Sequence, residues 1–281
     1  MQSAAGAAGA ALVAVAAVGA AATTVHAPQP MHPLSEDTME WVADWDDGNV
    51  FDDPWLERGS PDVRYEVDDG ELRITGDVHR LYVRDPRGEK QWGDVEVTVY
   101  FKRVADDDIP YSGMTSVVRA NHLETSGSAP CDTRGLSARL RNDGTVDFGK
   151  EVSHPKTVAT GQQQVWPGGL PRDEWIGYKH IVYDTEDGVV QEVWVDTNEG
   201  RDGGDWELVA SHVDDFLNPS WGAGESPCAA GVDPALPLTN DTYREGSESG
   251  KPNLAVYFRA DGLWKNGLVY KWASVREITV D

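Results

Sequence analysis

Apolar and polar residues alternate with a period of two through most of the chain, and each alternating stretch ends at a short turn. From Leu136 to Arg141 the order Leu, Ser, Ala, Arg, Leu, Arg has no exception. Successive side chains of a strand point to opposite faces, so this period predicts a half-buried strand. Asn142-Asp143-Gly144 follows, and Asp and Gly accept the positive φ of hairpin turns. Thr145 to Val152 is therefore predicted to return as the partner strand.

The same pattern recurs along the chain, and it is longest from Asp94 to Val104. About ten or more short strands are expected between turns rich in Gly, Asp and Asn, and outside the N-terminal stretch no helical period is evident. The sequence therefore predicts an all-β fold, an antiparallel β-sandwich. A chain of 281 residues is long enough for one such domain. We find no repeat of fixed length, which disfavours a propeller.

The N-terminal stretch is of a different kind. Residues 3–25 are almost purely Ala, Gly and Val, which is typical of the apolar part of a secretory signal. The usual basic region before it is missing, so a start upstream of Met1 is one interpretation, and a retained membrane anchor is the alternative. We expect a leader over 1–27, a Pro-rich linker over 28–38 and a single domain over 39–281. The protein is then secreted or at the cell surface, with no stable membrane span after processing.

The chain carries 48 acidic and 24 basic residues, a formal net charge of −24. Nucleic acids and anionic membranes would be repelled, so we exclude both as partners. Carboxylates stay hydrated and their repulsion is screened in concentrated salt, which favours a halophilic protein over an ordinary acidic secreted one. Only Cys131 and Cys228 are present, and in an exported chain such a pair predicts one disulfide closing a long loop; two free thiols are the alternative.

Several segments resemble a known family. Trp55, the run Tyr65 to Ile74, the run Trp92 to Val97 and a strand that reaches Arg119 resemble the opening of concanavalin A-like lectin/glucanase jelly rolls, and Tyr270 to Val280 resembles their final strand. The resemblance implies a jelly roll whose concave sheet binds carbohydrate. That superfamily includes lectins, glucanases and polysaccharide lyases, and the fold alone does not choose among them.

The carboxylate pattern disfavours a glycoside hydrolase. Retaining glucanases of this fold carry an E-x-D-x-E strand, with two carboxylates close enough to act as nucleophile and acid/base. The nearest approach here places Glu192 and Asp196 on one face with Trp194 between them. If the protein is an enzyme, we therefore expect a lyase before a hydrolase.

A polysaccharide lyase must neutralise a uronate carboxylate, remove the adjacent proton and protonate the leaving oxygen. Arg119 with Asn121, and Tyr178 with His180, are spaced two apart in predicted strands and are our candidate catalytic residues. The family's R-x-E-x-R and Q-x-H strands are not matched. The plainer alternative is that the arginines pair with surface carboxylates and that His180 is a half-buried strand residue.

Other residues are candidates for binding a sugar chain or a metal ion. Side chains on the same polar face, or loop indoles that could stack on a sugar ring, are Arg139, Arg141, Tyr257, Arg259, Trp166 and Trp264. His122 and Glu124 are either a base with its partner or solvated groups. An Asp-rich segment suggests a structural calcium ion, with Asp44, Asp46 and Asp52 as ligands, although its spacing is not that of an EF-hand. No cofactor is expected to be required.

No phosphate-binding glycine loop, G-x-S-x-G, H-E-x-x-H or C-x-x-C motif occurs in the sequence. The sequence therefore favours an exported, monomeric protein that acts on polysaccharide, by β-elimination of an acidic glycan. The alternative is a noncatalytic glycan-binding or cell-surface module, and a structural surface-layer component is a third interpretation.

Overall fold

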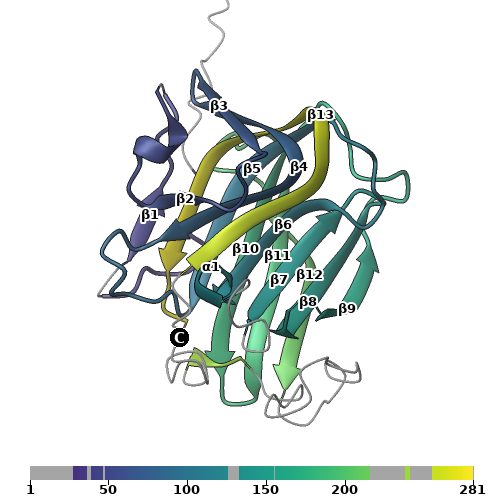
Figure 1. Cartoon of the computed structure of the whole chain (residues 1–281). Helices are drawn as coiled ribbons and strands as arrows, with labels where there is room; N and C mark the ends of the chain where they lie inside the picture. The colour runs from purple at the N-terminus through teal and green to yellow at the C-terminus, as the bar shows by residue number, and fades with distance from the viewer. Residues whose placement is uncertain are drawn as a thin grey trace, which may run out of the picture.

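Two strands, β4 (Glu71–Arg84) and β13 (Ala255–Glu277), each run through both layers of a β-sandwich (Figure 1). The computed structural model describes residues 28–36, 39–46, 48–125, 133–154, 156–215, 238–240 and 255–280. The first half of β13 pairs with β6 and with the second half of β4. Its second half pairs with β5, with the first half of β4 and with β1. One continuous strand therefore joins the two layers.

The layer that carries the candidate site is called the groove sheet. Its strands are antiparallel neighbours. In order they are β2 (Leu56–Arg58), the second half of β4, the first half of β13, β6 (Gly113–Ala120), β7 (Gly135–Arg141), β8 (Thr145–Ser153) and β9 (Lys156–Gln164).

The opposite layer, the back sheet, is also antiparallel. It consists of β3 (Arg64–Asp68), the first half of β4, the second half of β13, β5 (Val95–Ala105), β10 (Trp175–Thr185), β11 (Gly188–Asp196) and β12 (Glu207–Asp215), with β1 (Glu40–Val42) beside the end of β13. Helical structure in the described part of the chain is limited to α1 (His122–Thr125), the 3-10 turn η1 (Val50–Asp52) and the residue Asn240. The predicted all-β antiparallel sandwich is confirmed.

The hairpin expected around Asn142 is present. β7 pairs with β8 in the register Leu140 to Val146, and the Gly144 amide donates to the Arg141 carbonyl at 2.9 Å. Gly144 has a φ of 80°, a conformation that favours glycine. The alternation in β7 therefore has the predicted consequence, because Leu136, Ala138 and Leu140 are fully buried while Arg139 and Arg141 are partly exposed.

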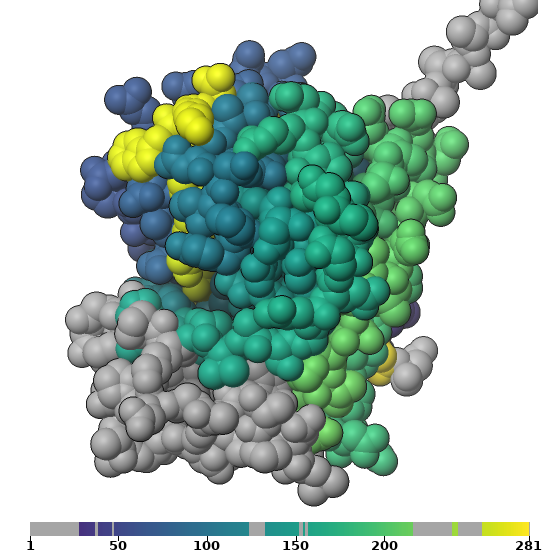
Figure 2. Space-filling view, turned by 90° about the vertical axis from the view of Figure 1, so that its right-hand side faces the viewer, coloured from purple at the N-terminus to yellow at the C-terminus, as the bar shows by residue number. Residues whose placement is uncertain are grey.

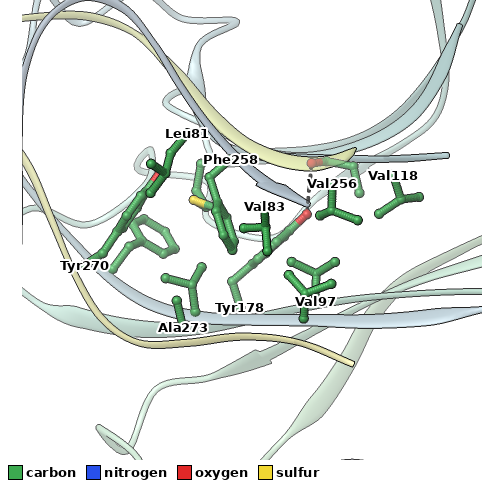
Figure 3. Close-up of a cluster of buried hydrophobic side chains, with 14 of the residues drawn as sticks. Leu81, Val83, Val97, Val118, Tyr178, Val256, Phe258, Tyr270 and Ala273 are labelled. Carbon is green, nitrogen blue, oxygen red and sulfur yellow. Dashed lines mark hydrogen bonds between the residues drawn. The ribbon is translucent and has the colours of Figure 1, made fainter. Parts of the chain in front are cut away.

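The core lies between the two sheets and is built from the inward residues of both (Figure 3). Val97 and Tyr178 come from the back sheet, and Leu81, Val118 and Phe258 from the groove sheet; none of them is exposed. Full burial of such a side chain stabilises the fold by about 1.5–3 kcal/mol. The two sheets are thus held together by apolar contact across the sandwich.

Residues 28–36, expected as part of a linker, are held against the back sheet. The Met31 amide donates to Glu96 at 2.6 Å, Arg276 donates to the Pro28 carbonyl at 3.1 Å, and Leu34 forms an isolated bridge with Ile278. The predicted leader over 1–27 and both cysteines, Cys131 and Cys228, lie outside the described residues. No helix in the described ranges is long and apolar enough to cross a membrane.

The bend of β13 generates a stability prediction. Gly267 has a φ of 64°, and a Cβ added there would lie 1.7 Å from the Ile74 carbonyl oxygen. Gly203 has a φ of 93° but a Cβ would meet nothing within 4 Å, so it is a matched control. We expect Gly203→Ala to lower the free energy of unfolding by about 1–2 kcal/mol and Gly267→Ala by more than about 3 kcal/mol in urea titrations. Equal losses would contradict a backbone contact at the bend.

Candidate functional site

A hollow of about 210 Å³ lies on the outer face of the groove sheet. Its floor consists of residues that alternate with core residues along three adjacent strands, among them Thr115 of β6, Arg139 of β7, and Tyr257 and Arg259 of β13. Glu151 of β8 also lines it. Figure 2 shows the teal strands of this layer with β13 in yellow beside them. We call this hollow the groove.

Two arginines in the groove are each held by a carboxylate of the same sheet. Arg139 donates from Nε and Nη2 to Asp147, at 2.6 Å in both cases. Arg259 donates from the same two nitrogens to Asp261 at 3.1 and 3.2 Å. Such fork-like pairs fix the plane of the guanidinium. Within the described residues Nη1 of each arginine makes no hydrogen bond, so each retains a donor for a ligand.

A cluster of two histidines and one glutamate borders the groove. His122 Nε2 lies 2.6 Å from one carboxylate oxygen of Glu151, and His154 Nδ1 lies 2.8 Å from the other. His122 comes from α1, Glu151 from β8, and His154 from the turn that follows β8. The His122 ring also packs against Tyr257, with 5.3 Å between the ring centroids. The cluster therefore adjoins the phenol on the groove floor.

The environment sets the protonation of two groups that line the groove. Burial raises the pKa of the Tyr257 phenol well above its usual value, and neighbouring Tyr82 and Glu151 add to the effect. Burial alone would raise the pKa of the Glu151 carboxyl, but hydrogen bonds and charge from His122 and His154 outweigh it and lower the pKa. At neutral pH the groove thus presents a protonated phenol near an ionised carboxylate. Groups perturbed in this way, close together in a hollow, are typical of reactive sites.

Tyr178 and His180 were predicted as catalytic, and the structure places both inside the core with no exposed surface. The hydroxyl of Ser116 lies 2.7 Å from the Tyr178 hydroxyl and 2.8 Å from His180 Nδ1, and the Tyr178 hydroxyl donates to the Ala138 carbonyl at 2.9 Å. Their placement in the core does not support the predicted catalytic roles. Alternation along β10 identifies which residues share a face, and that face points between the sheets.

Arg119 and Asn121 are also buried, which corrects the second half of the predicted catalytic set. Arg119 pairs with Asp94 at 2.9 Å and with Asp184 at 2.7 Å, and it has a φ of 50° that breaks the alternation at the end of β6. Asn121 accepts a hydrogen bond from the Arg134 amide at 2.7 Å. These side chains hold the end of the sandwich together and do not reach the groove.

The remaining predicted residues are dispersed. Arg141 lies next to Arg139 and pairs with Asp143 and Asp147. Trp166 lines a separate hollow near β12, and Trp264, which is 59% exposed, lines another beside Arg64. Neither indole lines the groove.

Asp44, Asp46 and Asp52 do not converge on one point. Among the described residues, the single set of three acidic, histidine or cysteine groups whose ligand atoms all lie within 4.8 Å of one another is His122, Glu151 and His154. The expected calcium ligands are thus not supported by their placement. Sequence analysis singled out His122 but paired it with Glu124. It missed Glu151 and His154, although their spacing of three residues at the end of an alternating run was a signal that could have identified them.

No family model and no curated protein matches the sequence. Among solved structures, a Ca²⁺-bound form of the VIP36 exoplasmic/lumenal domain is 10% identical, with a TM-score of 0.47, over 88% of this chain and 94% of that one. Winged bean acidic lectin complexed with methyl-α-D-galactose is 10% identical, with a TM-score of 0.44, over 87% and 100%. Porphyranase B from Zobellia galactanivorans is 9% identical, with a TM-score of 0.46, over 92% and 100%. These likenesses concern the fold alone.

Burial of His180 predicts how stability depends on pH. Burial lowers the pKa of its imidazole from 6.5 to about 3, so between these values the unfolded chain takes up a proton that the folded chain does not. The stabilisation is complete above pH 6.5 and is lost as the pH falls toward 3. Urea titrations measure the free energy of unfolding at each pH. As the pH falls from 7 to 5, we expect this free energy to decrease by about 2 kcal/mol less in His180→Gln than in the wild type. Titration of the His180 ring near 6.5 by NMR would contradict this burial.

Proposed function

We propose that the protein is exported, that the groove binds an acidic polysaccharide, and that it cleaves the chain by β-elimination. The observation that carries the proposal is the convergence of Arg139, Arg259 and Tyr257 on one hollow, next to the cluster of His122, Glu151 and His154. These are the residue types that the chemistry needs. Arg139 and Arg259 are partly exposed in the hollow, whereas Tyr257, His122 and Glu151 are buried beside it.

The two arginines would bind the carboxylate of a uronate residue. Each guanidinium is oriented by its own carboxylate, Asp147 or Asp261, and keeps Nη1 for a ligand oxygen. Arginine suits this role because it stays charged at any physiological pH and presents donors in a fixed plane. Hydrogen bonds to the ligand carboxylate would also withdraw charge from the adjacent carbon, which makes its proton easier to remove.

The elimination needs a base and an acid. A base takes the proton from the carbon beside the carboxylate, the freed electron pair forms a carbon–carbon double bond, and the glycosidic C–O bond at the neighbouring carbon breaks. Tyr257 suits the acid that protonates the leaving oxygen, because its phenol lines the groove and carries a proton at neutral pH. The imidazole–carboxylate cluster beside it suits the base.

A noncatalytic glycan-binding module is the alternative. It is favoured by one observation, that Tyr111, which is 58% exposed, stands at the rim of the groove where a sugar ring can stack on it. In that case Tyr257 and the cluster would only shape the binding surface.

Uronate polymers distinguish the two functions when the purified protein is incubated with them in concentrated salt. We expect ultraviolet absorbance from the unsaturated product to rise with time. Tyr257→Phe should slow its formation by a factor of about 100 or more, because a general acid is lost, while leaving glycan affinity within about twofold. Absorbance that fails to rise, with binding retained, would favour the module.

Arg259→Gln tests the binding half of the proposal. We expect polymer affinity to fall by about 10- to 100-fold, because a hydrogen bond to a charged group is lost. Arg87→Gln is the control, since Arg87 lies on an exposed turn and does not line the groove. Isothermal titration of both variants with a uronate oligosaccharide gives the comparison, and equal affinities would remove Arg259 from the site.

A further inference from the structure

The cluster of His122, Glu151 and His154 has the composition of a metal site. Its three ligand atoms all lie within 4.8 Å of one another, and the two imidazole rings stand nearly perpendicular, at 88°. His122 is 2% exposed and Glu151 is 7% exposed, while the side chain of His154 is 27% exposed. The site is therefore mostly enclosed by protein, with one side near solvent.

Charge balance favours a cation at this position. Glu151 is a buried carboxylate, and in the described residues its salt-bridge partners are only the two histidines. Buried carboxylates are costly unless positive charge and hydrogen bonds compensate them. Three other buried carboxylates in described strands pair with a lysine or an arginine: Asp147 with Arg139, Asp214 with Lys150, and Glu96 with Lys179. Asp196, at the end of β11, instead accepts hydrogen bonds from Tyr100 and backbone amides. Glu151 differs from all of these because its partners are histidines, which are also metal ligands.

The histidine side of the cluster is equally incomplete. His122 Nδ1 is buried and has no hydrogen-bond partner among the described residues. Without a metal ion, the Glu151 carboxylate accepts the proton of Nε2, the nitrogen that faces it, at 2.6 Å. A metal ion would displace this proton, and the lone pair of Nε2 would then face the ion, as coordination requires.

We propose that His122, Glu151 and His154 bind a divalent transition metal ion, zinc. Two imidazoles and one carboxylate form a ligand set that zinc takes in catalytic sites, whereas calcium takes six to eight oxygens. Tetrahedral zinc at bond lengths near 2.1 Å holds its ligand atoms about 3.4 Å apart. The present contacts of 2.6 and 2.8 Å are slightly shorter, so the carboxylate has to move by less than about 1 Å to admit the ion.

The ion would act on the groove through its remaining coordination position. Zinc with three protein ligands keeps a fourth position for water or substrate, and Glu151 lines the groove. A water in that position would be acidic enough to provide the base near neutral pH, in place of the imidazoles that hold the ion. This role rests on the proposed function, whereas binding of the ion does not.

Calorimetric titration of the chelator-treated protein with zinc chloride tests the inference. The buffer should contain 1 M NaCl and excess magnesium, so that the acidic surface does not compete for the added ion. We expect one site of micromolar or tighter affinity, weakened at least 100-fold in His154→Ala and in Glu151→Gln. The matched control is His32→Ala, whose ring contacts Tyr183 and belongs to no cluster. Cobalt in place of zinc should give the intense visible absorption of a tetrahedral site, which both site variants should lose.

Several outcomes would overturn the inference: no saturable zinc binding, equal affinity in His154→Ala and wild type, or an octahedral cobalt spectrum. Circular dichroism and urea titration of each variant show whether it is folded, and Glu151→Gln keeps the shape of the site if His154→Ala does not.

Elimination assays with and without chelator separate the proposed metal site from the proposed function. Activity that survives chelation in a protein without zinc binding contradicts the metal site alone, and zinc binding without elimination contradicts the proposed function alone.

Discussion

The bend of β13 is the constraint on which the other features depend. Because the strand turns at Gly262 and Gly267, its first half lies in the groove sheet and its second half in the back sheet. Alternation in the first half then sends Phe258 into the core and places Tyr257 and Arg259 on the groove floor. The same strand that joins the layers thus supplies the centre of the candidate site.

Electrostatics explains why a chain of net charge −24 can still present cations on one face. Arg119 is buried with Asp94 and Asp184, and it is fully used by the fold. In the groove, Arg139 and Arg259 lie at the surface of the sheet, where one carboxylate fixes each of them and one donor is left over. Both kinds of arginine are ion-paired, so burial is what distinguishes them: Arg119 is fully buried, whereas Arg139 and Arg259 are partly exposed.

The local sequence pattern predicted the sandwich architecture and part of the groove. It did not predict features that depend on contacts between strands distant in sequence. The β7–β8 hairpin and the shared face of Arg139 and Arg141 follow from a period of two and a turn sequence. The period does not indicate which face of β10 meets the other sheet, so Tyr178 and His180 were assigned outward although they are buried. Likewise, nothing in the sequence brings His122 to Glu151, because that contact depends on the register of three strands and the position of α1.

The central claim is that the groove is where an acidic polysaccharide binds. A crystal structure of Tyr257→Phe with a uronate tetrasaccharide tests it most directly, because that variant should bind the sugar without cleaving it. The account predicts a uronate carboxylate within hydrogen-bond distance of Nη1 of Arg139 or Arg259, with the scissile oxygen facing position 257. A tetrasaccharide bound on the back sheet, or at the hollow beside Trp166, would contradict it.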